Sequence, residues 1–142
     1  MKKNWFSLSV IFLAVMLAMG VSSCKKDDDK TALTLSELKT GDIDMNGATA
    51  PNNVPAEPTI TATFSTDVDA ATATATNITL MRDYDQANIP VTITSSGKTI
   101  TIVPSESLAS GALHKLTLGA GIKSTEGEAL GTAIERIFTT DG

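Results

Sequence analysis

Oxygen-bearing side chains are spaced along one segment as they are in a calcium loop. Asp42, Asp44 and Asn46 stand at alternate positions and Gly47 follows, which matches the first half of a twelve-residue loop. The twelfth position, where such a loop needs a bidentate carboxylate, is Asn53. These three side chains are therefore an incomplete candidate metal site, and a polar turn after a first strand explains the same residues.

Two pairs of aspartates could in principle serve glycoside hydrolysis, which needs two carboxyl groups. Asp67 pairs with Asp69, and Asp83 pairs with Asp85, and in an extended segment each pair points to one side. Both pairs fall at expected strand ends, where aspartate commonly serves turns. Tyr84 is the only tyrosine of the chain, so no aromatic platform accompanies them. We therefore expect neither pair to be catalytic.

Nucleophilic and metal-dependent catalysis lack the residues that they need. The chain has one cysteine, Cys24, and one histidine, His114, and it has neither a Gly-x-Ser-x-Gly elbow nor a glycine-rich phosphate loop. One histidine cannot supply a zinc site. His114 shares strand parity with Leu116 and Leu118, which predicts a core residue with a local hydrogen bond. The sequence therefore predicts a protein that is not an enzyme and needs no cofactor.

The elements that would hold these side chains are β-strands, because apolar and polar residues alternate with period two. An alanine-rich stretch at 69–75 is expected to form a helical turn, and Ser96-Gly97 a hairpin turn. About seven short strands predict an all-β antiparallel sandwich. The expected strands are 59–64, 89–94 and 99–102, and further ones near 38–44, 77–82, 113–119 and 133–139.

The N-terminal residues have the layout of an export signal. Lys2 and Lys3 precede an apolar run from Trp5 to Met19, and small residues follow it. A run of about 15 residues is shorter than the roughly 20 that span a bilayer. We therefore expect residues 1–23 to be a removed signal peptide.

The end of this signal resembles the lipobox of bacterial lipoproteins. The residues are Val21, Ser22, Ser23 and Cys24, with Ser23 where glycine or alanine is commoner. The resemblance implies cleavage before Cys24 and its lipidation, and the several acyl chains of such a group give stable membrane anchoring. The cysteine is then bound to lipid, and the membrane is an expected partner.

A charged segment follows the cysteine. Residues 25–30 read Lys-Lys-Asp-Asp-Asp-Lys, so residues 24–37 are expected to be the lipidated cysteine and a flexible tether. The acid-rich run also resembles the signal that sends some Gram-negative lipoproteins to the outer face of the outer membrane. A plain spacer on a periplasm-facing protein remains the alternative.

The remaining chain suits one acidic domain. Residues 24–142 hold all 16 acidic residues but lack two of the 11 basic ones, Lys2 and Lys3, so their formal charge is about −7. Such a charge removes the electrostatic basis for binding nucleic acid. We expect a single domain over 38–142.

Three segments in order resemble the bacterial Ig-like domain of the SbsA type, which is common in surface proteins. They are Gly47-Ala48 through Phe64-Ser65 to Asp69, then 99–104, then Leu108 to Thr140. The resemblance implies an Ig-like β-sandwich over most of 38–140. His114 stands where the family usually has tyrosine, and Ser124 and Glu128 stand where it often has aspartate and asparagine. Arg136 is in phase with Ile134 and Phe138, which indicates an edge strand or an arginine that extends to solvent.

These observations predict a lipid-anchored, non-catalytic Ig-like module of the cell envelope. It would act in adhesion or protein interaction, or as a structural spacer, in the outer membrane and at the cell surface. The alternatives are an accessory glycan-binding lipoprotein and the N-terminal module of a larger surface protein. The sequence assigns no ligand-binding residues.

Overall fold

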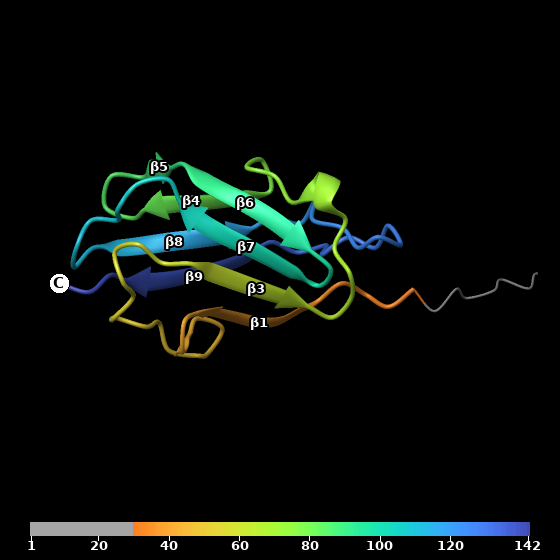
Figure 1. The fold of residues 1–142 in the computed structure, drawn as a ribbon, viewed down its shortest axis with the longest axis horizontal. Coiled ribbons are helices and arrows are strands. Elements are labelled where there is room, and N and C mark those ends of the chain that lie inside the picture. The colour runs from red at the N-terminus through yellow and green to blue at the C-terminus, as the bar shows by residue number, and fades with distance from the viewer. Residues whose placement is uncertain (1–29) are drawn as a thin grey trace, which may run out of the picture.

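The computed structural model describes residues 30–142, which form two antiparallel β-sheets packed face to face (Figure 1). This confirms the predicted all-β sandwich. The first sheet has the order β2-β1-β3-β7-β6 and the second the order β5-β4-β8-β9. The described strands number nine instead of about seven, because the expected strands 38–44 and 89–94 are each divided in two, into β1 and β2 and into β5 and β6. The first division is a tight turn at Gly41 and Asp42, across which Thr40 pairs with Ile43. The elements are β1 (Leu35–Thr40), β2 (Ile43–Asp44), β3 (Ile60–Phe64), the 3-10 helix η1 (Ala70–Thr72), β4 (Ile78–Arg82), β5 (Ala87–Ile89), β6 (Val91–Ser96), β7 (Thr99–Pro104), β8 (Leu113–Leu118) and β9 (Ile134–Thr139).

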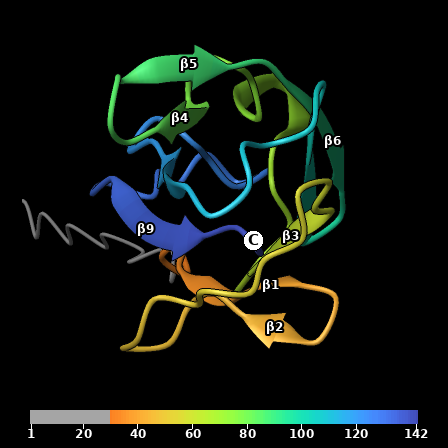
Figure 2. The same ribbon diagram turned by 90° about the vertical axis from the view of Figure 1, so that its left-hand side faces the viewer.

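The core lies between the two sheets, as the view onto one end of the sandwich shows (Figure 2). Along β3, β4, β7 and β8 the apolar side chains that alternate with threonines or charged residues point inward and are buried. Because the side-chain period of a strand is two, this alternation places one face of each sheet in the core. The two largest buried side chains are Phe64 and Phe138.

The predicted strand 89–94 is wrong in one respect, because the chain changes sheets within it. β5 pairs with β4 in the second sheet, whereas β6 pairs with β7 in the first. Pro90 separates the two strands, and a proline has a fixed φ and no N–H to donate to a ladder. Its carbonyl accepts a hydrogen bond from the Ser105 N–H at 2.8 Å. The sequence alternation continues through Pro90 because Ile89 and Val91 both face the same core, from opposite sheets.

The sandwich begins earlier than residue 38. β1 starts at Leu35, and Leu33 before it is 2% exposed. The Thr34 N–H donates to the Ser65 hydroxyl at 3.0 Å, and the Ser65 N–H donates back to the Thr34 carbonyl at 2.9 Å. The last part of the expected tether 24–37 is therefore packed on the domain, because Leu33 supplies an apolar side chain that the charged run before it lacks.

The hairpin between β6 and β7 turns one residue later than predicted. Ser96 pairs with Thr99, so the turn residues are Gly97 and Lys98 instead of Ser96-Gly97. Gly97 has a φ of 56°, which glycine adopts without strain and which suits the first central position of a type II′ turn.

The two ends of the sandwich carry different segments. The described chain enters at Lys30 at the right-hand end of Figure 1, whereas β4 and β5 are joined by the loop 83–86 at the opposite end. We call that opposite end the far end. The start of β8 lies there as well, since the Asp83 N–H donates to the Leu113 carbonyl at 2.9 Å.

Candidate functional site

The predicted lipidation site lies outside the described residues. Val21, Ser22, Ser23 and Cys24 all precede Lys30, so lipidation of Cys24 stays a prediction. Within residues 30–142 the structure has no helix with the length and apolar character to cross a bilayer.

The incomplete calcium candidate forms part of a shallow hollow beside β1 and β2. Asp42, Asp44 and Asn46 all line it, together with Glu37 and Lys39. The Asp44 Oδ1 accepts the Asn46 N–H at 2.8 Å, which closes a polar turn of the kind that also explains these residues. Within residues 30–142 no three His, Cys, Asp or Glu side chains are grouped so that they could hold a metal ion.

Asn46 is already engaged by a cation. The Arg136 guanidinium on β9 donates to the Asn46 Oδ1 from Nε at 3.2 Å and from Nη2 at 2.8 Å. A positive charge at one of the three candidate oxygens opposes a second cation there. Arg136 lies on an edge strand and points to the open side of the core, as its phase with Phe138 indicated. The pair joins the edge of the second sheet to the turn after β2.

The pair Asp67 and Asp69 serves loop structure. The Asp69 Oδ1 accepts the Ala71 N–H at 3.0 Å and caps η1, which confirms the predicted helical turn. The Asp67 carbonyl accepts the Thr125 N–H at 2.9 Å. Both residues therefore hold the segment between β3 and β4 in place.

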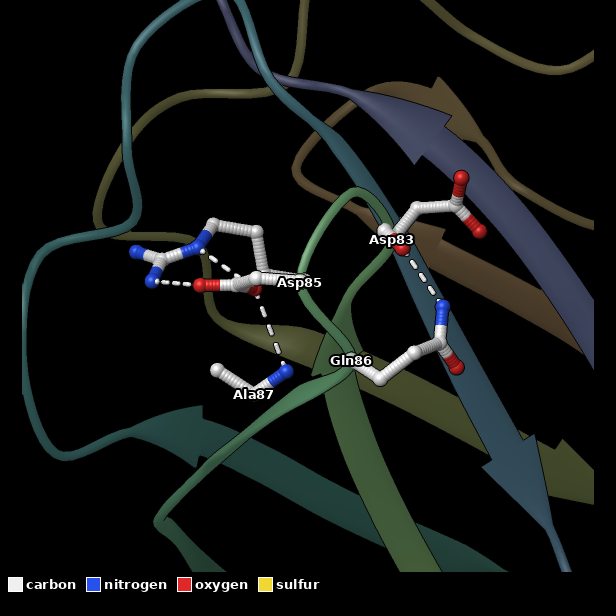
Figure 3. A network of polar contacts seen from close by, with 5 residues as sticks. Asp83, Asp85, Gln86 and Ala87 are labelled. Atoms are coloured by element: carbon white, nitrogen blue, oxygen red, sulfur yellow. Dashed lines mark hydrogen bonds and ion pairs between the residues drawn. The ribbon is translucent and has the colours of Figure 1, made fainter.

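The pair Asp83 and Asp85 lies in the β4–β5 loop, and the two carboxylates point in different directions (Figure 3). The Asp85 Oδ1 accepts the Ala87 N–H at 3.1 Å, whereas the Asp83 carboxylate makes no hydrogen bond or ion pair within residues 30–142. The loop is closed by the Gln86 Nε2, which donates to the Asp83 carbonyl at 2.5 Å. Two carboxylates that diverge cannot share one glycosidic bond, and glycoside hydrolysis requires them to flank it.

Arg82 binds Asp85 with two parallel hydrogen bonds. Its Nε donates to Oδ1 at 3.1 Å and its Nη2 donates to Oδ2 at 2.5 Å, the bidentate geometry that suits a planar guanidinium. The hydrogen bond from Arg82 holds the pKa of the Asp85 carboxyl below its usual value. The same guanidinium carbon lies 4.8 Å from the centre of the Tyr84 ring, a cation–π contact. One arginine therefore positions both neighbours.

Tyr84 is the large apolar side chain with the greatest exposure among residues 30–142. It is 71% exposed, against 46% for Ile137 and 38% for Val103. Gln86, in the same loop, is the non-glycine residue of this part of the chain with a positive φ, at 56°. Such backbone strain persists only where surrounding contacts impose it. The loop is thus held by side-chain contacts in a shape that presents an aromatic ring at the far end.

His114 is a core residue, as its parity predicted. Its ring is fully buried, lies 5.5 Å from the Phe138 ring, and has Nδ1 at 2.9 Å from the Ala112 carbonyl. Burial lowers its pKa, and the Arg82 charge acts in the same direction, whereas the Ala112 hydrogen bond opposes them. A buried ring of this kind has no access to a ligand.

Ser124 and Glu128, which stand where the resembled family often has aspartate and asparagine, close a loop. The Ser124 hydroxyl accepts the Glu128 N–H at 3.1 Å, and the Ser124 N–H donates to the Glu128 carbonyl at 2.8 Å. Ser124 is 2% exposed. The Ser124 side chain therefore closes the loop by a direct hydrogen bond from the Glu128 backbone N–H.

The arrangement of Arg82, Tyr84 and Asp85 was missed by sequence reasoning. The sequence singled out Asp83 and Asp85 as a carboxylate pair about Tyr84, but it did not connect Asp85 with Arg82. An arginine three residues before an aspartate, at the end of one strand and before the next, was the available signal. It is weak, because i, i+3 charge pairs are common on surfaces.

Within residues 30–142 the structure does not bring the sequence-predicted candidate groups together at one site. The candidate groups either serve turns, are buried, or diverge, and the two hollows beside β1–β2 and β9 are open. The β4–β5 loop is held by side-chain hydrogen bonds and carries an exposed ring.

Comparison with known protein families and with solved structures agrees with this fold. Residues 29–140 match the family model described as a bacterial Ig-like domain. The N-terminal part of the bacterial S-layer protein SbsC is similar, with a TM-score of 0.54 and 18% identity over 78% of this chain and 24% of that one. A longer structure of SbsC is also similar, with a TM-score of 0.53 and 19% identity over 78% of this chain and 14% of that one. No curated protein matches the chain.

At these identities the SbsC structures indicate the fold alone, and this chain spans about a quarter or less of their length. The family match covers most of the chain, from residue 29 to residue 140. The resemblance of the three sequence segments is thereby confirmed at the level of the family, and the chain belongs to the bacterial Ig-like domain family.

Proposed function

We propose that this protein is a non-catalytic module of the cell envelope, anchored by lipid on Cys24, that carries its Ig-like sandwich outside the inner membrane and uses it in adhesion or protein interaction. The observation that best supports this proposal is where the described chain begins on the sandwich. Lys30 lies at one end of the sandwich and the β4–β5 loop at the other, so an anchor six residues before Lys30 leaves the far end turned away from the membrane.

The contacts of the first described residues support a short connection. The Lys30 amino group lies 3.6 Å from the Glu128 carboxylate, and Leu33 is buried. If residues 25–31 are a coil, they span about 15 Å. The domain would then stand close to the membrane and present its far end outward.

The cell surface is part of the proposal, and so is the outer membrane. Two observations support it: SbsC, whose structures are similar, is an S-layer protein, and the acid-rich run 25–30 follows the residues that resemble a lipobox. A periplasm-facing position and a role as plain spacer are the competing outcomes.

The test compares intact cells that produce the wild-type chain with cells that produce Cys24→Ala. Membrane fractionation is combined with protease treatment from outside. We expect the wild type in the membrane fraction and cleaved, and the variant in the soluble fraction. A membrane-bound but protected wild type would place the module in the periplasm. A variant that still partitions with membranes would refute the anchor.

A second candidate function, glycan binding, is favoured by one observation. Tyr84 supplies an exposed aromatic ring, although the sequence is poor in aromatic residues.

A further inference from the structure

We infer that the β4–β5 loop is a carbohydrate-binding site, in which the open face of the Tyr84 ring stacks on a sugar ring of an extended neutral glycan. The inference deepens the second candidate function, glycan binding, and rests on the proposed anchor for the outward direction of the loop, whereas the binding itself is measured in solution without a membrane.

The ring is prepared for such a contact. The Arg82 guanidinium lies 4.8 Å from the ring centre on one side, and Asp85 holds that guanidinium by two hydrogen bonds. Tyr84 is 71% exposed, which leaves room for a ligand on the ring beside the Arg82 contact. A ring whose position is already restricted loses little conformational entropy on binding. The carbon-bound hydrogens on one face of a pyranose are apolar and pack on the negative face of an aromatic ring.

The neighbours of the ring are polar. Asp83 carries a carboxylate that is free of partners within residues 30–142, and the Gln86 amide nitrogen is engaged while its oxygen makes no hydrogen bond there. Such acceptors suit sugar hydroxyls, each of which needs a partner once water is displaced. A protein partner is less favoured, because protein hot spots lie in an apolar patch that excludes water. No other large exposed apolar side chain lies on this loop.

The shape of the site decides the size of the ligand. Tyr84 stands on the surface, and the two hollows beside β1–β2 and β9 are lined by other segments. A ring that stands free can meet one unit of a chain lying across it, but it cannot enclose a single small sugar. Binding is therefore weak per site, with a dissociation constant on the order of 1 mM, and many anchored copies on one polymer would strengthen it.

The sole tyrosine makes the test specific. The full chain is produced with ring-¹³C-labelled tyrosine, so that every labelled signal comes from Tyr84, and it is kept in a detergent without a sugar headgroup. Maltohexaose, cellohexaose, laminarihexaose and chitohexaose are titrated in turn. We expect at least one of them to shift the Tyr84 ring signals saturably, and saturation transfer to reach the carbon-bound protons of that sugar.

Variants separate stacking from other effects. Tyr84→Ala should lower the saturation transfer at least tenfold, Tyr84→Phe should retain most of it because the ring remains, and Ile137→Ala should retain it because this exposed side chain lies on β9. Absence of any shift with all four sugars, or equal transfer to Tyr84→Ala and the wild type, overturns the assignment. Shifts of the Tyr84 signals with an envelope protein but with none of the sugars overturn it in favour of a protein partner. None of these outcomes depends on where Cys24 anchors the chain.

Discussion

The imidazole of His114 stacks on the phenyl ring of Phe138, with 5.5 Å between ring centres and 18° between ring planes. The two residues are register partners on β8 and β9. The His114 Nδ1 donates to the Ala112 carbonyl at 2.9 Å, so the Nε2 of the neutral ring carries no proton. This Nε2 is buried and has no partner within residues 30–142. A proton added to it would be a buried donor without an acceptor, which agrees with the lowered pKa.

The pH dependence of stability should follow from this pair. The pKa of His114 in the folded chain is below 6.5, its ordinary value, so the unfolded chain binds the proton more readily. The free energy of unfolding should therefore fall as the pH decreases through about 6.5, and it should continue to fall until the pH passes below the folded pKa. Urea denaturation at a series of pH values between about 8 and 5.5 measures it. His114→Phe should flatten this slope, and an unchanged slope in that variant would assign the dependence to other groups.

The pair of Asn46 and Arg136 should contribute to stability. Asn46→Ala removes the oxygen that accepts two hydrogen bonds from a part-buried guanidinium, and it should lower the free energy of unfolding by about 1–3 kcal/mol. The matched control is Asp42→Ala in the same hollow, whose carboxylate makes no hydrogen bond within residues 30–142 and whose loss should change stability by less than about 0.5 kcal/mol. Equal effects of the two substitutions in urea denaturation would contradict the role of the pair.

Calcium should leave the thermal stability unchanged. The Arg136 charge occupies the Asn46 oxygen, and Asp42 and Asp44 alone supply too few ligands for Ca²⁺, which takes six to eight oxygens. Calorimetry of the chain with millimolar calcium and with a chelator checks this. A melting temperature that rises with calcium concentration would revive the candidate site, because a ligand of the folded state stabilises it.

The alternation of apolar and polar residues predicted the sandwich, because in each strand it shows which side chains face the core. The alternation in β3 and β7 is visible in the sequence and needs no knowledge of partners. It could not show that Pro90 ends one strand and begins another in a different sheet, since Ile89 and Val91 both remain inward. Pro90 marks the break in the sequence, but only the strand pairing shows that the chain passes from one sheet to the other there.

The candidate site was less predictable, because its geometry comes from contacts between side chains. Asn46 and Arg136 are 90 residues apart, and no spacing rule connects them. Asp85 looked like half of a carboxylate pair, whereas its partner is Arg82. The exposure of Tyr84 depends on the loop shape that these contacts impose, which composition cannot show.

Close packing at Gly119 gives a further prediction. A Cβ at this position would lie 2.7 Å from the Asn77 carbonyl oxygen, which belongs to the backbone and cannot move away easily. Gly119→Ala should therefore destabilise the fold by about 1–3 kcal/mol, as overpacking does. Gly47→Ala is the control, since its nearest contact is the Asp44 carboxylate at 3.3 Å, the end of an exposed side chain. Thermal denaturation should show a clear drop for the first variant only, and equal melting temperatures would contradict the close contact.

The order of the Tyr84 ring should depend on Asp85 and on pH. Asp85→Ala removes both hydrogen bonds from Arg82 and the acceptor of the Ala87 N–H, so the ring should become more mobile, measured by ¹³C relaxation of the single tyrosine. The melting temperature should change little, because an exposed ion pair contributes little to stability. Asp83→Ala is the matched control and should leave the ring signals as they are.

Because Arg82 lowers the pKa of Asp85 below 3.8, the pair persists above that value and is lost as the pH falls through the folded pKa. Between neutral pH and acid, the ring signals of the wild type should therefore change only below about pH 3.8. A change centred between about pH 4.5 and 7 would show that Asp85 does not hold the loop.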